Sequence, residues 1–122
     1  MCRILLSIKP EYVEMIFNNT KKYEYRRIPA KNKVNSILIY SSCPVKKVVG
    51  RLKIKSVIMK RPSTLWTMTR HGAGISKGVF DKYFSGKKIA YAYKIESFKK
   101  YKKPKNLNYF GISVPPQSFM YV

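Results

Sequence analysis

The residues with the clearest capacity for chemistry stand in the segment NNTKKYEYRR, residues 18–27, where Lys21, Glu24 and Arg26 form the pattern K-x-x-E-x-R. Glu24 is one of only five acidic residues in a chain of 122. Cations beside a carboxylate favour its ionised form, which accepts hydrogen bonds well and is a poor general acid. Two interpretations are open at this point. Glu24 is either a structural ion-pair partner of Arg26 or Arg27, or part of a site shared with Lys21.

The elements around this pattern are predicted from hydrophobic periodicity. Residues 3–9 are β-prone and end at Pro10, and the following PEYVEMIFNN places apolar residues at helical spacing. From Lys22 the period changes to two, so Glu24 and Arg26 project from the same face of a strand. Lys21 sits at the entry to that strand, and all three side chains can border one concavity.

The rest of the chain predicts more strands, with helices inserted between them. NSILIYSS indicates a strand buried on both faces, and VKKVVGRLKIKSVIM a long strand with a basic outer face and a bend at Gly50. Residues 62–86 predict two short helices joined by a glycine-containing link, in which Trp66 is interpreted as a core residue with base stacking as the alternative. KKIAYAYKIESF predicts a further strand whose paired alanines allow a helix to pack closely.

The C-terminal part predicts a loop and a closing strand. The lysine run 99–105 is interpreted as a solvated loop, with an electrostatic arm for phosphates as the alternative. SFMYV is expected to form the last strand, after Pro115 and Pro116. This order predicts an α+β fold, a small mixed β-barrel of about five or six strands with two or three short helices at its rim. We expect one domain over residues 1–122.

The charge balance restricts the partners. The chain has 26 Lys and Arg against 5 Asp and Glu, a formal net charge of +21. Such a surface attracts polyanions over a Debye length of roughly 8–10 Å, and nucleic acid is the commonest polyanion in a cell. Lysine supplies 20 of the 26 cations, which also fits an AT-rich genome, and lysine lacks the planar fork that reads guanine edges. The composition therefore favours nucleic-acid binding and argues against base-specific readout of a duplex.

The remaining candidates for site chemistry are sparse. Cys2, Cys43 and His71 have no metal-ligand spacing, so we expect no metal and no cofactor. The start of the chain resembles neither a signal peptide nor a membrane span, which predicts a cytoplasmic protein without membrane contact. We expect a monomer.

The quoted opening, LLSIKPEYVEMIFNNTKKYEYRR, resembles that of ASCH domains, members of the PUA-like superfamily with the motif G-x-K-x-x-E-x-R after a helix. The match holds at Lys21, Glu24 and Arg26 and departs at Asn19, where the family usually has glycine; asparagine tolerates a left-handed backbone better than most residues. The similarity continues through IYSSCPVKKVVG, LW, AGIS, FDKYFSGKKIAYAYKI and FGISVPPQSFMYV, as in the bacterial and archaeal group described as predicted transcriptional regulators. It covers nearly the whole chain.

The resemblance implies a PUA-like β-barrel with a cleft beside the first helix, lined by the motif residues and suited to RNA or a nucleobase. Ser42 stands in the family's Y-x-S-x-P element, where it either contacts a base or phosphate or caps a turn. Some relatives carry a helix-turn-helix extension, and we expect none in this chain. One branch hydrolyses acetylated cytidine with a threonine nucleophile where this chain has Glu24, and other ASCH proteins are reported as ribonucleases.

We therefore expect binding of RNA, or of single-stranded nucleic acid or a modified nucleobase, in RNA metabolism or transcription regulation. Lys21 and Arg26 would meet phosphate or a base carbonyl, and Glu24 would accept from a base amino group. The strand cations Arg51, Lys53 and Lys55 would follow the backbone, and Ser42 would add a hydrogen bond. No catalytic residue is assigned. The alternative is a small hydrolase, a ribonuclease or an acetylcytidine amidohydrolase, in which Lys21 and Glu24 would be catalytic.

Overall fold

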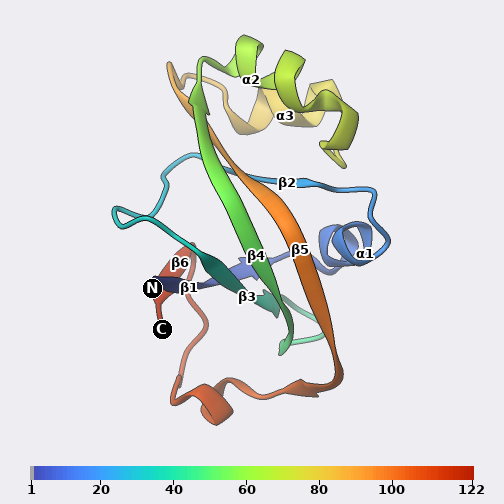
Figure 1. Cartoon of the computed structure of the whole chain (residues 1–122), viewed down its shortest axis with the longest axis vertical. Helices are drawn as coiled ribbons and strands as arrows, with labels where there is room; N and C mark the ends of the chain where they lie inside the picture. Colours follow the sequence, from blue (N-terminus) through green and yellow to red (C-terminus); the bar gives the residue numbers. More distant parts are fainter. Residues whose placement is uncertain (1) are drawn as a thin grey trace.

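The computed structural model describes residues 2–122, which form a six-stranded mixed sheet with three α-helices and two short 3₁₀ helices (Figure 1). The strand order is β2-β5-β4-β3-β1-β6, with β1 and β3 parallel and the other neighbours antiparallel. The strands are β1 (Arg3–Ile8), β2 (Tyr23–Arg26), β3 (Ser36–Ser41), β4 (Lys47–Lys60), β5 (Ala90–Lys105) and β6 (Phe119–Tyr121).

Helix α1 (Pro10–Phe17) covers one face of the sheet beside β1. It begins where predicted, with Pro10 in its first turn, and buries Val13 and Ile16. These two side chains pack against alternate residues of β1, β3 and β4, such as Leu6, Ile39 and Leu52, in the largest buried cluster. The helical spacing of α1 and the period-two alternation of the strands therefore meet in one core, as the sequence predicts.

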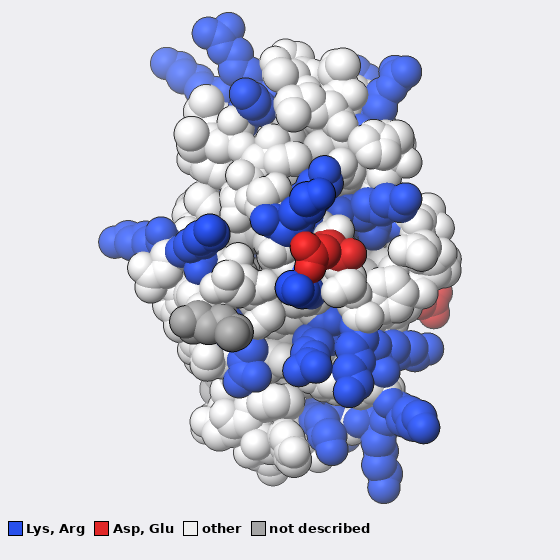
Figure 2. Space-filling view, in the orientation of Figure 1, with Lys and Arg blue, Asp and Glu red and all other residues white. Residues whose placement is uncertain are grey.

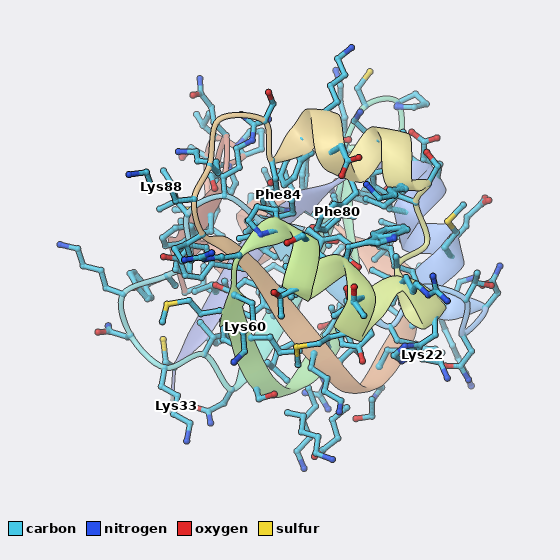
Figure 3. All side chains as sticks on the ribbon, turned by 90° about the horizontal axis from the view of Figure 1, so that it is seen from above. Lys22, Lys33, Lys60, Phe80, Phe84 and Lys88 are labelled. Atoms are coloured by element: carbon cyan, nitrogen blue, oxygen red, sulfur yellow. The ribbon has the colours of Figure 1, made fainter. Side chains whose placement is uncertain are left out.

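Helices α2 (Pro62–Thr69) and α3 (Lys77–Tyr83) lie at one end of the molecule, linked by the 3₁₀ turn Arg70–Gly72 (Figure 1). Figure 3 shows Phe80 and Phe84 side by side between these helices, while Lys33 and Lys88 lie at the periphery. The two phenylalanines pack on Ala90 and Ala92 of β5, both fully buried. The paired alanines thus admit helices, and half-buried Trp66 packs on Phe80, which confirms its interpretation as a core residue.

Strand β3 is buried on both faces, as its unbroken apolar run predicts. Ile37 and Ile39 belong to the cluster under α1, and Leu38 and Tyr40 to a smaller cluster on the opposite face. The C-terminal segment covers that smaller cluster with the 3₁₀ helix Leu107–Phe110 and with β6. The predicted last strand is confirmed, because β6 pairs with β1.

Strands β4 and β5 form the long ribbon that runs the length of the molecule in Figure 1. The lysine run was expected to be a loop, and that expectation is wrong, because β5 continues to Lys105 and pairs there with Val48. Pairing with the neighbouring strand β4 keeps this lysine-rich segment in the sheet in spite of its charge. The bend predicted at Gly50 is confirmed by a register shift, and a Cβ at this position would lie 2.4 Å from the Lys99 carbonyl oxygen.

The sheet is a half-barrel, with β2 and β6 as its edges. Strand β6 pairs only with Ile4–Leu6, so β1 extends beyond it. The carbonyl oxygen of Ser7 instead accepts a hydrogen bond of 3.0 Å from Nη2 of Arg26, on edge strand β2. A side chain thus joins the two strands where the backbone ladder does not. The α+β class and the small PUA-like barrel with rim helices are confirmed.

Candidate functional site

A cavity of about 230 Å³ lies in this gap between the end of β1, the start of α1, strand β2 and the region of α3. The motif residues Lys21, Glu24 and Arg26 all line it. Its other lining residues are Ser7, Ile8, Lys9, Tyr12, Tyr25, Ile75, Val79 and Tyr83. The cavity is slightly smaller than the roughly 300–1,000 Å³ that drug-sized ligands need, so it suits one base-sized group.

The turn after α1 brings Lys21 to the cavity. Helix α1 is capped at Asn18, and Asn19 adopts a left-handed backbone with φ of 69°, as expected for asparagine in place of glycine. The backbone N–H groups of Thr20 and Lys21 then both donate to the Met15 carbonyl oxygen. This tight turn reverses the chain so that Lys21 points inward while Lys22 remains exposed.

Lys21 is buried, with 3% of its surface exposed. Its Nζ donates to the carbonyl oxygen of Ala73 at 2.7 Å and lies 4.9 Å from the centre of the Tyr25 ring and 5.3 Å from that of Tyr12. The side chain passes over Gly74, where an added Cβ would lie 2.7 Å from Lys21 Cβ. One carbonyl and two aromatic faces therefore hold an ammonium group that has three donors to offer.

Burial lowers the pKa of Lys21 from its ordinary value, because the charged amine loses solvation. The negative charge of Glu24 acts in the opposite direction, and the positive charge of Arg26 lowers the pKa further. An amine with a lowered pKa is more readily deprotonated than a surface lysine.

Glu24 and Arg26 form a partly buried ion pair from adjacent same-face positions of β2. The Nη2 of Arg26 lies 2.9 Å from Glu24 Oε2, and the two side chains are 13% and 7% exposed. The same Nη2 donates to the Ser7 carbonyl oxygen, while Nε is buried and has no hydrogen-bond partner among the described residues. A buried donor without an acceptor costs about 1–3 kcal/mol. An acceptor atom on a ligand or a water molecule would relieve that cost.

Three tyrosines line the cavity: Tyr12, Tyr25 and Tyr83. The Thr69 hydroxyl donates to the Leu65 carbonyl oxygen at 2.7 Å, so the 2.6 Å contact between Tyr25 and Thr69 has the tyrosine as donor. Burial raises the pKa of Tyr25 to about 12, with smaller effects from its neighbours, and burial also raises the pKa of Tyr12 and of Tyr83. All three are therefore protonated at neutral pH and offer aromatic surface for a planar group.

The other residues predicted for binding lie outside this cavity. Ser42 is half-buried in the turn after β3, where its N–H donates to the Ile8 carbonyl oxygen, so its backbone lies near the cavity-lining end of β1. Arg51 and Lys53 are exposed on β4 and line a second groove. Lys55 is exposed where the ladder shifts register between Ile54 and Ser56, so the three strand cations do not form a regular track.

Sequence reasoning missed several residues that shape the cavity. Tyr12 lies in the predicted first helix and Tyr83 in the predicted helical segment 62–86, and neither was expected to line a site. Gly74 belongs to the predicted glycine-containing link, and its φ of +68° and its contact with Lys21 make it part of the site. The pattern AGIS, in which a glycine follows a short helix, carried the only signal for this contact.

The described residues contain no cluster of three or more His, Cys, Asp or Glu side chains that could hold a metal ion. Within the same part of the chain, no helix is long and apolar enough to span a membrane.

A half-open mixed barrel with a Lys, Glu and Arg cavity beside its first helix defines a PUA-like α+β domain. The ASCH domain family matches residues 6–110, and the chain belongs to that family. The crystal structure of ASCH from Zymomonas mobilis has the same fold, with a TM-score of 0.86 and 28% identity over 98% of this chain and 87% of that chain.

Two relatives illustrate where such a domain occurs. The large ribosomal subunit protein uL22 of Ureaplasma parvum is 32% identical over 121 residues, which are 98% of this chain and 39% of that protein. The chain thus spans about two fifths of the length of this relative. A Zymomonas mobilis protein named ASCH domain-containing ribonuclease is 31% identical over 90 residues, 73% of this chain and 61% of that protein.

Proposed function

We propose that this protein binds single-stranded RNA by holding one unstacked base in the cavity between β2, α1 and α3. The observation that carries the proposal is the unused hydrogen-bonding capacity around the cavity. Among residues 2–122, the Lys21 Nζ donates only to the Ala73 carbonyl oxygen although it has three donors, and on the Glu24 carboxylate only Oε2 accepts a side-chain hydrogen bond, from Arg26. A base edge supplies both donors and acceptors, so it complements a site that offers an ammonium, a guanidinium and a carboxylate.

The aromatic and electrostatic character of the cavity supports the same ligand. Tyr12, Tyr25 and Tyr83 provide apolar faces, and stacking on an aromatic ring is worth about 1–3 kcal/mol per base. Three cations, including Lys9, line the cavity with one acid, so the ligand is expected to bring negative charge. The name of the Zymomonas mobilis relative, a ribonuclease, supports RNA over DNA as the polymer. Such binding would serve RNA metabolism or transcription regulation.

A matched pair of variants tests the proposal. Lys21→Met and Lys22→Met remove the same charge from adjacent positions, one in the cavity and one exposed. We expect Lys21→Met to weaken binding of a short single-stranded RNA about tenfold or more. The reason is that the variant loses a charge-assisted hydrogen bond worth about 1.5–3 kcal/mol. Lys22→Met should shift affinity far less. Equal affinities of the two variants, measured by fluorescence anisotropy, would refute the assignment of the cavity.

A ribonuclease is the second candidate, favoured by the lowered pKa of Lys21 and by the name of that same relative. Cleavage would need a base to accept the 2′-hydroxyl proton, and the amine of Lys21 is suited to that role. Labelled RNA incubated with the wild type, Lys21→Met and Lys22→Met distinguishes cleavage from binding. Turnover that survives in Lys22→Met and disappears in Lys21→Met and in Glu24→Gln would replace the binding proposal with the enzyme.

The amidohydrolase alternative has less support. Its branch uses a threonine hydroxyl as nucleophile, and this chain has a carboxylate, Glu24, at that position, paired with Arg26. Hydrolysis of acetylcytidine by the purified protein would show this assessment to be wrong.

A further inference from the structure

A second groove, of about 690 Å³, crosses the sheet on the face opposite α1. It is lined by Arg3, Asn35, Ser36, Arg51, Leu52, Lys53, Ser97, Phe98, Lys99 and Val122, and we call it the sheet groove. It shares no lining residue with the motif cavity.

The strand register explains why these side chains gather. Arg3 pairs with Ser36, Ser36 with Lys53, and Lys53 with Ser97, so one row crosses β1, β3, β4 and β5. Directly paired residues project from the same face of a sheet. In the next row Arg51 pairs with Lys99. Residues that are far apart in sequence therefore present cations and hydroxyl groups on one surface.

The charges of the sheet groove are poorly compensated. Lys53 forms an ion pair with Glu96 at 3.0 Å, but both side chains are well exposed, so the contact contributes only about 0–1 kcal/mol. Among the ion pairs within residues 2–122, none involves Arg3, Arg51 or Lys99. Figure 2 shows many Lys and Arg side chains over the face of β4 and β5, with few acidic atoms between them. The lining holds four cations and no acid, and the nearby Glu96 pairs with one of these cations, so positive charge is in excess.

The direct pairing of Arg51 with Lys99 is itself unfavourable, because like charges opposite each other destabilise a sheet. A bound polyanion would convert this repulsion into two attractive contacts. A groove lined by serine hydroxyl groups and cations suits a thin, flexible strand of phosphates. Basic residues alone attract anionic lipid headgroups only electrostatically, and stable anchoring to a lipid surface needs an apolar element in addition.

We propose that the sheet groove binds the sugar-phosphate backbone of single-stranded RNA, with Arg51 and Lys99 at phosphates and Ser36 and Ser97 donating to phosphate or sugar oxygens. The inference rests on the proposed function, since it describes the strand to which the base in the cavity belongs. Arg3 and Ser7 mark the two sites on β1, four residues and therefore roughly 13 Å apart. A strand that reaches both sites must be several nucleotides long.

The test compares two double variants with equal change of charge. Arg51→Gln/Lys99→Gln removes two cations from the sheet groove, and Lys87→Gln/Lys88→Gln removes two exposed cations from the turn after α3. Binding of a single-stranded RNA of about ten nucleotides and of a mononucleotide is measured over a range of salt concentrations. Loss of two phosphate contacts lowers the slope of log K against log salt by about 1.4, and lowers the affinity near 0.15 M salt about tenfold. The control variant should keep the wild-type slope, and mononucleotide binding should not change.

The outcomes separate the two proposals. If Lys21→Met weakens RNA binding but the sheet-groove variant matches its control, the sheet groove is refuted and the cavity stands. If the wild type binds neither RNA nor mononucleotide, both proposals fail. If only binding to phosphatidylserine vesicles falls in the sheet-groove variant, the surface is lipid-directed and the RNA assignment is overturned.

A measurement on the free protein adds an independent readout. Lys99→Gln removes the repulsion with Arg51 and should raise the unfolding temperature of the free protein while weakening RNA binding. A lower unfolding temperature would show that Lys99 stabilises the fold, and the pairing of Arg51 with Lys99 would then no longer support a bound polyanion.

Discussion

The ion pair between Glu24 and Arg26 allows a decisive test of whether the motif is structural or serves a ligand. Glu24→Met leaves the Arg26 guanidinium, 87% buried as a side chain, without its carboxylate, and Arg26→Met leaves Glu24 without its cation. Removal of one partner from a buried pair costs about 3–5 kcal/mol. For a domain of this size that corresponds to a fall in unfolding temperature of roughly 10–20 °C.

The double variant Glu24→Met/Arg26→Met should be much more stable than the sum of the single variants predicts. Apolar replacement of a whole buried pair is often neutral or stabilising. The remaining loss is the charge-assisted hydrogen bond from Arg26 to the Ser7 carbonyl oxygen, about 1.5–3 kcal/mol, so we expect the double variant within about 3 kcal/mol of wild type. Urea unfolding followed by circular dichroism gives all three free energies.

RNA binding by the same double variant completes the test. We expect a folded protein that has lost the affinity of the wild type, because the charges serve the ligand more than the fold. Single-variant losses that simply add, within about 0.5 kcal/mol, would refute the coupling derived from the 2.9 Å contact. A stable double variant that keeps wild-type RNA affinity would refute the assignment of the site.

Three further predictions concern the surroundings of the cavity. Gly74→Ala should lower the free energy of unfolding in urea by about 1–3 kcal/mol more than Gly86→Ala. Both glycines have a positive φ, but only at Gly74 would the new Cβ meet Lys21, whereas Gly86 has open space around it. Equal losses of stability would show that the contact with Lys21 does not matter. Because the pKa of Lys21 is lowered, the unfolded chain binds more protons than the folded chain between that pKa and 10.5, so stability should rise with pH across this window. The measurement is the difference in unfolding free energy between wild type and Lys21→Met as a function of pH. A difference that does not change with pH would contradict the lowered pKa. The raised pKa of Tyr25 acts in the opposite sense, so the wild type should lose stability from pH 10 to about 12 more steeply than Tyr25→Phe. Parallel curves of unfolding free energy against pH for the two proteins would count against the burial of that hydroxyl.

Much of the fold was accessible from the sequence because local patterns and tertiary burial agree. The run Ile37–Tyr40 is apolar on both faces and lies between two clusters, and Ala90 and Ala92 are small where two helices pack. The lysine run 99–105 was misread because charge outweighed the alternation of strand β5, and pairing with β4 makes the difference. That pairing is a property of a distant segment, which local patterns do not contain.

For the site, the residue pattern alone placed Glu24 and Arg26 on one face of a strand and Lys21 at its entry, because period-two geometry is local. The folded chain brings these side chains together around a cavity with Tyr12 and Tyr83, and there the Ala73 carbonyl oxygen accepts a hydrogen bond from the Lys21 ammonium. It also gathered Arg3, Arg51 and Lys99 into the sheet groove. The physical reason is that burial and the distance between charges depend on which strands become neighbours, and strand order is set by the packing of the whole core.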